Sequence, residues 1–309
     1  MQILKSPRGR ALSLGLAMAL GAITTVEAQP AATKKFPAAL EKTHIDGLSI
    51  RYARAPRKGA PSIVLLSPWP ESIFAFIPIW AQLTERYDVL ALDLPGFGAS
   101  EGRPEVIAPE AMGNFIVKAI RHFGLEKPHA VGPDVGTSSL LFAAANHPDA
   151  FGSISVGSGA VAYPLEVESS LKTLIELPSL APLQNIDIAK RIDGVLATQR
   201  NRVRDFVRAD YITSYSGAGR YAESARLVRR YPHELPILKT RLGKIQTPVL
   251  MIAGRHDPYV PVSNGHYLVE HMPSARLEIL DAGHFVWEDA SDSYGRLISE
   301  WVDQHEPRR

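Results

Sequence analysis

The sequence predicts an α/β fold with a mostly parallel sheet, and three observations support this prediction. Short continuous apolar runs at residues 63–66, 89–92 and 129–131 are typical of parallel strands buried on both faces. A stretch at 109–123 begins with proline and repeats apolar residues every 3.6 positions, as a helix does. The alternation of strand and helix returns near the C-terminus, which is the signature of an α/β protein.

The individual elements follow from local patterns. Near the start, apolar and polar residues alternate at 43–45 and 48–52 around Asp46-Gly47, a favoured two-residue turn, so we predict an antiparallel hairpin. The C-terminal block is predicted to contain, in order, a strand at 249–253, a helix at 263–271, a strand at 277–280 and a helix at 294–302.

The middle of the chain has a different pattern. No β-branched strand run occurs from 161 to 245, and amphipathic pieces around 171–177, 186–196 and 221–231 indicate helices. We therefore predict a helical cap at 161–245, inserted into the sheet domain. The predicted core consists of residues 43–160 and 246–309.

The first 28 residues have the layout of a secretion signal. Three basic residues precede an apolar run at 11–23, and small residues end at Ala28, where we expect cleavage. Residues 29–42 are then a leader to the core. We expect an exported protein, periplasmic or secreted, without stable membrane insertion after cleavage; the alternative is an uncleaved membrane anchor.

Composition excludes several classes of function. The formal net charge is +2, and residues 1–28 account for it with three basic residues and one acidic residue. A mature chain near neutrality, without a cluster of Lys or Arg, has no electrostatic footprint for nucleic acid. The chain has no cysteine, no metal-ligand spacing and no glycine-rich phosphate loop. We expect no metal, no cofactor and a small-molecule substrate as the partner.

The strongest motif is Gly132-Pro133-Asp134-Val135-Gly136, which follows an apolar strand and opens a helical run. It has the form of a nucleophile elbow, in which a sharp strand-to-helix turn lifts the central residue above the sheet. The central residue here is Asp134, and the helix N-terminus favours its ionised form. The alternative is that Asp134 only caps the helix.

A base and an orienting carboxylate follow this motif. Asp257 and His284 each come just after a predicted late strand, and active-site loops of open α/β sheets gather at these strand ends. A hydrolytic cycle needs a base to activate water and a carboxylate to orient that base. The sequence therefore predicts Asp134, Asp257 and His284 as a catalytic triad.

A fourth segment, Ser67-Pro68-Trp69-Pro70-Glu71-Ser72, follows the strand at 63–66. Together with the triad order and the loop at 93–100, it resembles the α/β-hydrolase superfamily, specifically its epoxide hydrolase and haloalkane dehalogenase branch. The resemblance covers nearly all of 43–303. It implies an eight-stranded, mostly parallel sheet flanked by helices, with an inserted helical cap. It also implies a cis Trp69-Pro70 bond and an oxyanion hole formed by the amides of Trp69 and Val135.

The sequence departs from that branch at three places. Ser67-Pro68 replaces the usual His-Gly, and Val135 stands where dehalogenases commonly place a halide-binding tryptophan; Trp69 could offer its indole N–H instead. Epoxide hydrolases use cap tyrosines to protonate the ring oxygen, but Val228 stands where one is expected. The substrate-binding candidates are Trp69, Tyr215 and Tyr231, and the cap also contains Tyr163 and Tyr211.

Three hypotheses of function remain open. The first is a hydrolase in which Asp134 forms a covalent ester with a small organic substrate, most simply an epoxide and secondly a haloalkane. The second is a serine esterase that uses Ser155, although no helix follows that residue to form an elbow. The third is a non-catalytic protein that binds a small apolar ligand under its cap.

Overall fold

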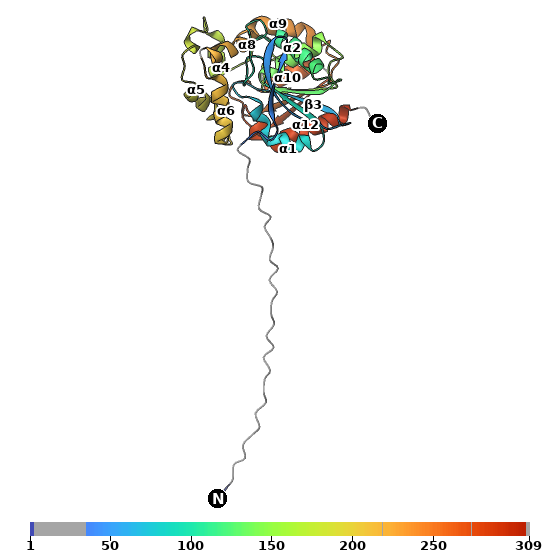
Figure 1. Cartoon of the computed structure of the whole chain (residues 1–309), viewed down its shortest axis with the longest axis vertical. Coiled ribbons are helices and arrows are strands. Elements are labelled where there is room, and N and C mark those ends of the chain that lie inside the picture. The colour runs from blue at the N-terminus through green and yellow to red at the C-terminus, as the bar shows by residue number, and fades with distance from the viewer. Residues whose placement is uncertain (3–34, 218, 273, 307–309) are drawn as a thin grey trace. The chain divides into compact units, whose positions relative to one another are not determined.

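An eight-stranded sheet forms the centre of the structure (Figure 1). The computed structural model describes residues 1–2, 35–217, 219–272 and 274–306. Residues 3–28 of the expected signal peptide and residues 29–34 of the leader therefore lie outside the described residues. The described residues from 35 onward belong to one compact unit.

The strands have the order β1-β2-β4-β3-β5-β6-β7-β8. β1 pairs with β2 and β2 pairs with β4 antiparallel, and the other five pairs are parallel, which confirms the predicted fold class. Their bounds are β1 Leu40–Ile45, β2 Leu48–Ala55, β3 Ser62–Leu66, β4 Asp88–Leu92, β5 His129–Pro133, β6 Ile154–Gly157, β7 Val249–Gly254 and β8 Ala275–Leu280.

The first hairpin forms where the sequence predicts it. Ile45 pairs with Leu48, so Asp46 and Gly47 alone make the turn. Their φ angles are +53° and +78°, and positive values at both central residues define the turn type whose twist matches the flanking strands. This turn fixes the register of the two strands at the edge of the sheet.

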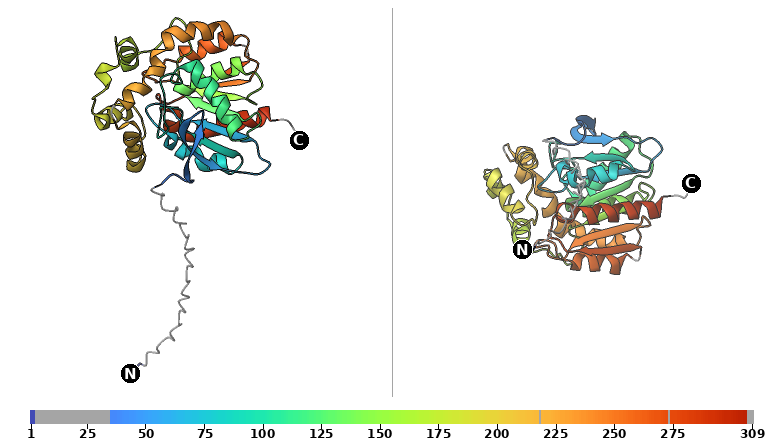
Figure 2. Two further views of the ribbon diagram at one scale, coloured as in Figure 1. Left: turned by 45° about the horizontal axis from the view of Figure 1, so that its top comes forward. Right: turned by 90° about the horizontal axis from the view of Figure 1, so that it is seen from below.

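Helices cover both faces of the sheet (Figure 2). One group, above the sheet in Figure 1, contains α2, α3, α9 and α10, which pack on one another; the other contains α1, α11 and α12. Among the described residues, none of the helices combines the length and apolarity needed to cross a bilayer. The bounds are α1 Ile77–Thr84, α2 Pro109–His122, α3 Val135–Asn146, α9 Tyr231–Leu242, α10 Ser263–His271, α11 Val286–Asp289 and α12 Ser291–His305.

All the regular secondary structure among the described residues between β6 and β7 is helical. Helices α4, α5, α6 and α8 lie at one side of the sheet in Figure 1 and form the cap. Helix α9, within the predicted cap segment, packs instead on α2 and α3 of the core. The remaining bounds are η1 Ile73–Phe76, α4 Ser169–Glu176, η2 Ala181–Leu183, α5 Ile188–Leu196, α6 Asp205–Tyr215, α7 Arg220–Ser224 and α8 Arg226–Arg229.

Gly254, the last residue of β7, allows the loop before His284 to approach the sheet. A Cβ atom on Gly254 would lie 1.9 Å from the carbonyl oxygen of Gly283. We expect Gly254→Ala to lower the free energy of unfolding by roughly 1–3 kcal/mol, because the backbone carrying His284 has to shift. Chemical denaturation measures this change.

Gly194, inside the cap helix α5, is the matched control. A Cβ atom there would meet nothing within 4 Å. Gly194→Ala should therefore raise the free energy of unfolding by about 0.5–1 kcal/mol, the usual gain in a helix. Equal effects of the two substitutions would contradict the close approach at Gly254.

Candidate active site

Asp134 lies on the sharp turn between β5 and α3. Its φ and ψ angles are 53° and −118°, a region that residues with a Cβ rarely occupy and that costs on the order of 1–3 kcal/mol. Its side chain makes no capping hydrogen bond to the first turn of α3. The strained turn therefore presents the carboxylate to the space above the sheet and does not use it as a helix cap.

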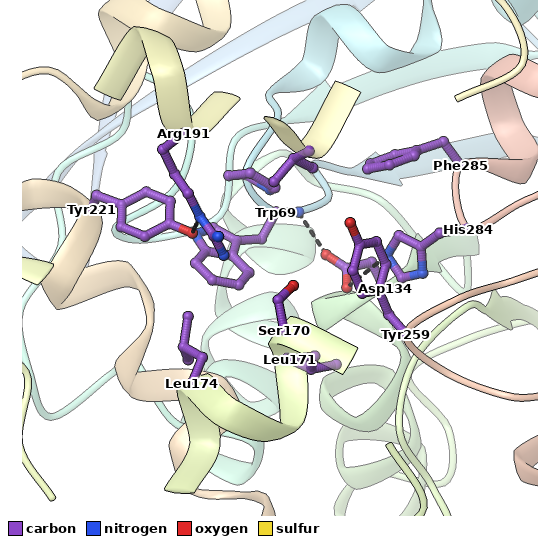
Figure 3. Close-up of a pocket in the computed structure, with 12 residues that line it drawn as sticks. Trp69, Asp134, Ser170, Leu171, Leu174, Arg191, Tyr221, Tyr259, His284 and Phe285 are labelled. Atoms are coloured by element: carbon purple, nitrogen blue, oxygen red, sulfur yellow. Dashed lines mark hydrogen bonds and ion pairs between the residues drawn. The ribbon is translucent and has the colours of Figure 1, made fainter. Parts of the chain in front are cut away.

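The two oxygens of the Asp134 carboxylate have different surroundings (Figure 3). Oδ2 accepts a hydrogen bond of 2.6 Å from the amide of Trp69. Oδ1 lies 3.6 Å from Nε2 of His284, which is too long for a good hydrogen bond. One oxygen is thus fixed by a backbone donor, and the other is left facing the imidazole.

Asp257 holds the other side of the imidazole. Its Oδ2 lies 2.8 Å from Nδ1 of His284, and its Oδ1 accepts the backbone amides of Tyr259 and Val260 at 2.8 and 3.0 Å. These amides fix the carboxylate, and the carboxylate fixes the imidazole ring. The structure therefore brings Asp134, Asp257 and His284 together from the ends of β5, β7 and β8.

His284 sits between two carboxylates in a buried place. Burial alone lowers its pKa, but the charge of Asp257 and the contact with Asp134 outweigh burial and raise the pKa to about 10. At neutral pH the resting site therefore holds an imidazolium. An imidazolium cannot remove a proton from water.

The loop that carries Trp69 connects β3 to η1, and the Trp69-Pro70 bond is cis, as the resemblance implies. Ser67, at the position of the missing histidine, accepts the amide of Leu94 at 3.0 Å and so ties this loop to the neighbouring one. The indole Nε1 of Trp69 donates to Ser224 in the cap at 2.7 Å. The amide of Val135 is in the first turn of α3, where no intrahelical acceptor is available.

A cavity lies directly above Asp134. Its volume is about 40 Å³, and a single water molecule needs roughly 10–15 Å³. The core side is lined by Trp69, Pro70, Asp134, Tyr259, His284 and Phe285. The cap side is lined by Ser170, Leu171, Leu174, Arg191, Val195 and Tyr221. The closed cap thus leaves room for only a few substrate atoms.

Two predicted substrate-binding residues do not line this cavity. The Tyr215 hydroxyl donates to the carbonyl oxygen of Glu71 at 2.9 Å and so stabilises the loop of Trp69. Tyr231 is also buried away from the cavity. Ser155 pairs with its neighbours in the middle of β6, so it is not on a turn and does not line the cavity.

Two aromatic residues that sequence reasoning missed line the cavity. The hydroxyl of Tyr221 accepts a hydrogen bond of 2.7 Å from Nε of Arg191, and within the described residues it donates to no protein acceptor. Burial raises its pKa, although Arg191 opposes this shift. The ring of Tyr259 packs edge-on against His284, with centroids 5.1 Å apart. Tyr221 is therefore a neutral phenol with a free proton.

In the described part of the chain, no group of three or more His, Asp or Glu side chains is arranged to hold a metal ion. The acids and the histidine of the site are bonded to one another and to backbone amides. What the site offers chemically is a carboxylate, an imidazole, amide donors and a phenol.

Comparison with known proteins identifies the family. A family model of the alpha/beta hydrolase fold matches residues 61–291. The uncharacterized hydrolase YugF of Bacillus subtilis is 24% identical over 268 residues, covering 84% of this chain and 96% of YugF. The 2-hydroxy-6-oxononadienedioate/2-hydroxy-6-oxononatrienedioate hydrolase of Comamonas testosteroni is 25% identical over 226 residues, covering 70% of this chain and 77% of that protein.

The same architecture occurs among solved structures. Cfl2 from Burkholderia cenocepacia superposes with a TM-score of 0.74 at 19% identity, covering 85% of this chain and 95% of Cfl2. At this identity the likeness shows the fold alone.

The raised pKa of His284 makes a prediction for stability. A basic group whose pKa rises on folding contributes stability that is complete below its unfolded value, near 6.5, and is lost as the pH rises toward about 10. We expect the unfolding constant to increase by up to tenfold per pH unit between about pH 7.5 and 9.5. His284→Gln, which does not titrate, should lack this increase. Equal pH dependence of both proteins in urea denaturation would show that His284 is not protonated in the folded state.

Proposed function

The chain belongs to the alpha/beta hydrolase fold family, and from this premise we propose that it hydrolyses small organic electrophiles, epoxides foremost, through an ester on Asp134. The observation that carries the proposal is the unequal environment of the two Asp134 oxygens. Oδ2 rests on the Trp69 amide, while Oδ1 faces the cavity near His284. This is the arrangement that a carboxylate nucleophile needs before and after attack.

In the first step, Oδ1 of Asp134 attacks a ring carbon of the epoxide. The new C–O bond forms as the ring C–O bond breaks, and the ring oxygen takes the proton of a nearby acid. Tyr221 fits this acid, because it lines the same cavity and its hydroxyl, beside Arg191, donates to no protein acceptor among the described residues. Arg191 donates to the phenol oxygen and so stabilises the phenolate that remains, which is then reprotonated from solvent.

Ester formation then turns His284 into a base. The alkylated Asp134 has lost its negative charge, so one of the two carboxylates that hold the pKa of His284 near 10 no longer acts. The imidazole can release its proton and remove one from the attacking water. Water adds to the ester carbon, and the developing oxyanion at Oδ2 is stabilised by the amides of Trp69 and Val135. Collapse of this intermediate breaks the bond to the diol oxygen, which takes the proton that His284 removed from water, and restores Asp134; His284 then regains its resting proton from solvent.

Carbon–halogen hydrolysis is less well supported. A halide ion needs N–H donors beside the reacting carbon, but the indole Nε1 of Trp69 already donates to Ser224, and the cavity's arginine, Arg191, donates through Nε to Tyr221. Val135 supplies no side-chain donor. An epoxide oxygen, in contrast, finds a proton donor in Tyr221.

The esterase and ligand-binding hypotheses have less support as well. Ser155 lies inside β6 with no base beside it. A passive binding site has no need of a strained aspartate turn or of an imidazole clamped between two carboxylates. The name of the Comamonas relative indicates a substrate of another chemical class, and at 25% identity it leaves the substrate of this chain open.

Mass spectrometry of the intact His284→Gln variant tests the covalent step. Without the base, the ester forms but is not hydrolysed, so incubation with a panel of epoxides should add the mass of one substrate to the peptide that contains Asp134. The double variant with Asp134→Asn is the control and should stay unmodified. A complete absence of adducts across epoxides and haloalkanes would contradict the mechanism.

Tyr221→Phe tests the acid. Loss of this proton donor should lower the rate of ring opening by about 10²–10⁴-fold, the usual contribution of a general acid, measured as kcat/KM with a turned-over epoxide. Tyr294→Phe, at a buried tyrosine of α12 outside the cavity, should change the rate less than threefold. Similar rates in both variants would remove Tyr221 from the mechanism.

A further inference from the structure

Two glutamates meet behind the loop that carries Trp69. Glu71 is 1% exposed, and Glu288 is partly buried. Nε2 of Gln199 bridges them, donating to Oε1 of Glu71 at 3.2 Å and, through a very short contact, to Oε2 of Glu288. Both carboxyls therefore lie within reach of one amide group.

Their other partners are neutral as well. Nε1 of Trp287 donates to Oε2 of Glu71 at 2.9 Å, and the Tyr211 hydroxyl donates to Oε1 of Glu288 at 3.1 Å. Every hydrogen-bond partner that the described residues give these two carboxyls is uncharged. Two carboxylates placed together out of water without a cation are very unfavourable.

The neighbouring charges have the same sign. The charge of Asp134 raises the pKa of Glu71, and the charge of Asp289 raises the pKa of Glu288. Asp210, on the same helix as Tyr211, is paired with Arg51 at 2.6 Å, so that arginine does not serve the two glutamates. Burial raises the pKa of Glu71 well above its usual range, and burial raises the pKa of Glu288 to about 7 against the hydrogen bonds that lower it.

The numbers of hydrogen-bond donors and acceptors also favour a protonated carboxyl. Oε1 of Gln199 is a buried acceptor without a partner among the described residues. The group as a whole thus has more acceptors than donors. A proton on one carboxyl supplies the missing donor and removes one negative charge.

This group connects three segments around the site, which are the loop of Trp69, α11 and the cap. Glu71 is two residues after Trp69, whose amide holds Asp134. Trp287 and Glu288 lie in α11, directly after His284. Gln199 and Tyr211 belong to the cap.

We propose that Glu71 and Glu288 share a proton in the folded enzyme, and that the protonated pair positions the Trp69 amide and His284 and fastens the cap to the core. Loss of the proton places two like charges side by side. The carboxyls then separate, and the contacts that hold the loop of Trp69, α11 and the cap against one another weaken together. Both glutamates are positioning residues, since neither lines the cavity.

The proton has a defined effect on stability. An acid whose pKa rises on folding is protonated in the folded state and ionised in the unfolded state at pH values above its usual 4.5, so rising pH favours unfolding. Between about pH 5 and 6.5, below the range in which His284 contributes, the unfolding constant should gain about tenfold per pH unit for each proton held.

Urea denaturation of Glu71→Gln in this pH range is the test. Glutamine keeps the shape but cannot titrate, so the pH slope should fall by about one proton relative to the wild type. Glu288→Gln serves as a second variant with the same expectation. Glu234→Gln is the control, because this buried glutamate has a cation partner, Arg230, at 3.0 Å; it should keep the wild-type slope. Identical slopes in all four proteins would overturn the shared proton.

The positioning role is tested by kinetics, and this arm alone rests on the proposed function. Glu71→Ala should lower kcat/KM about a hundredfold, as a displacement near 1 Å at a reacting group does, whereas Glu71→Gln should stay within about threefold of the wild type near neutral pH. If Glu71→Ala does not fold, Trp287→Phe removes the donor to Glu71 and should lower kcat/KM about tenfold. Unchanged kinetics in these variants would overturn the positioning role. A wild type that turns over no epoxide would contradict the proposed function and leave the denaturation result intact.

Discussion

The hydrogen bond from the Trp69 amide to Oδ2 of Asp134, 2.6 Å long, makes the two carboxylate oxygens unequal. It requires the loop after β3 to lie against the turn after β5, and the neighbouring parallel strands β3 and β5 bring the two together. In the proposed mechanism, the strained turn at Asp134 supplies the nucleophile, and the amide of the loop stabilises the developing oxyanion. The rest of the fold holds these two segments in place.

Negative charge is the main electrostatic problem of this site. Asp134 and Asp257 flank one imidazole, and Glu71 and Glu288 lie behind them with neutral partners. Protons take the place of cations in both groups. In the proposed mechanism, His284 retains its proton until Asp134 is neutralised as an ester, so ester formation itself releases the base. The arrangement explains how a buried histidine with a pKa near 10 can still serve a hydrolytic step.

The sequence predicts the sheet, its hairpin and the placement of Asp134, Asp257 and His284, because each lies at the end of an apolar strand, and strand ends converge. The cap residues that line the cavity could not be predicted in this way. Periodicity indicates that helices form around 221–231 but not which side chains face the cavity, so the sequence analysis names Tyr215 and Tyr231 as candidates and leaves out Tyr221. The pair of Glu71 and Glu288 was not predictable either, since its members come from opposite ends of the chain and only the tertiary fold joins them.

A single turnover in water labelled with oxygen-18 tests the covalent role of Asp134 most directly. With enzyme in excess over an epoxide, an ester delivers one of the unlabelled oxygens of Asp134 to the diol, and the labelled oxygen from water remains on the carboxylate. An ester on Asp134 predicts an unlabelled diol and a labelled peptide that contains Asp134. A labelled diol with an unlabelled Asp134 would mean that water attacks the substrate directly, and it would contradict the account.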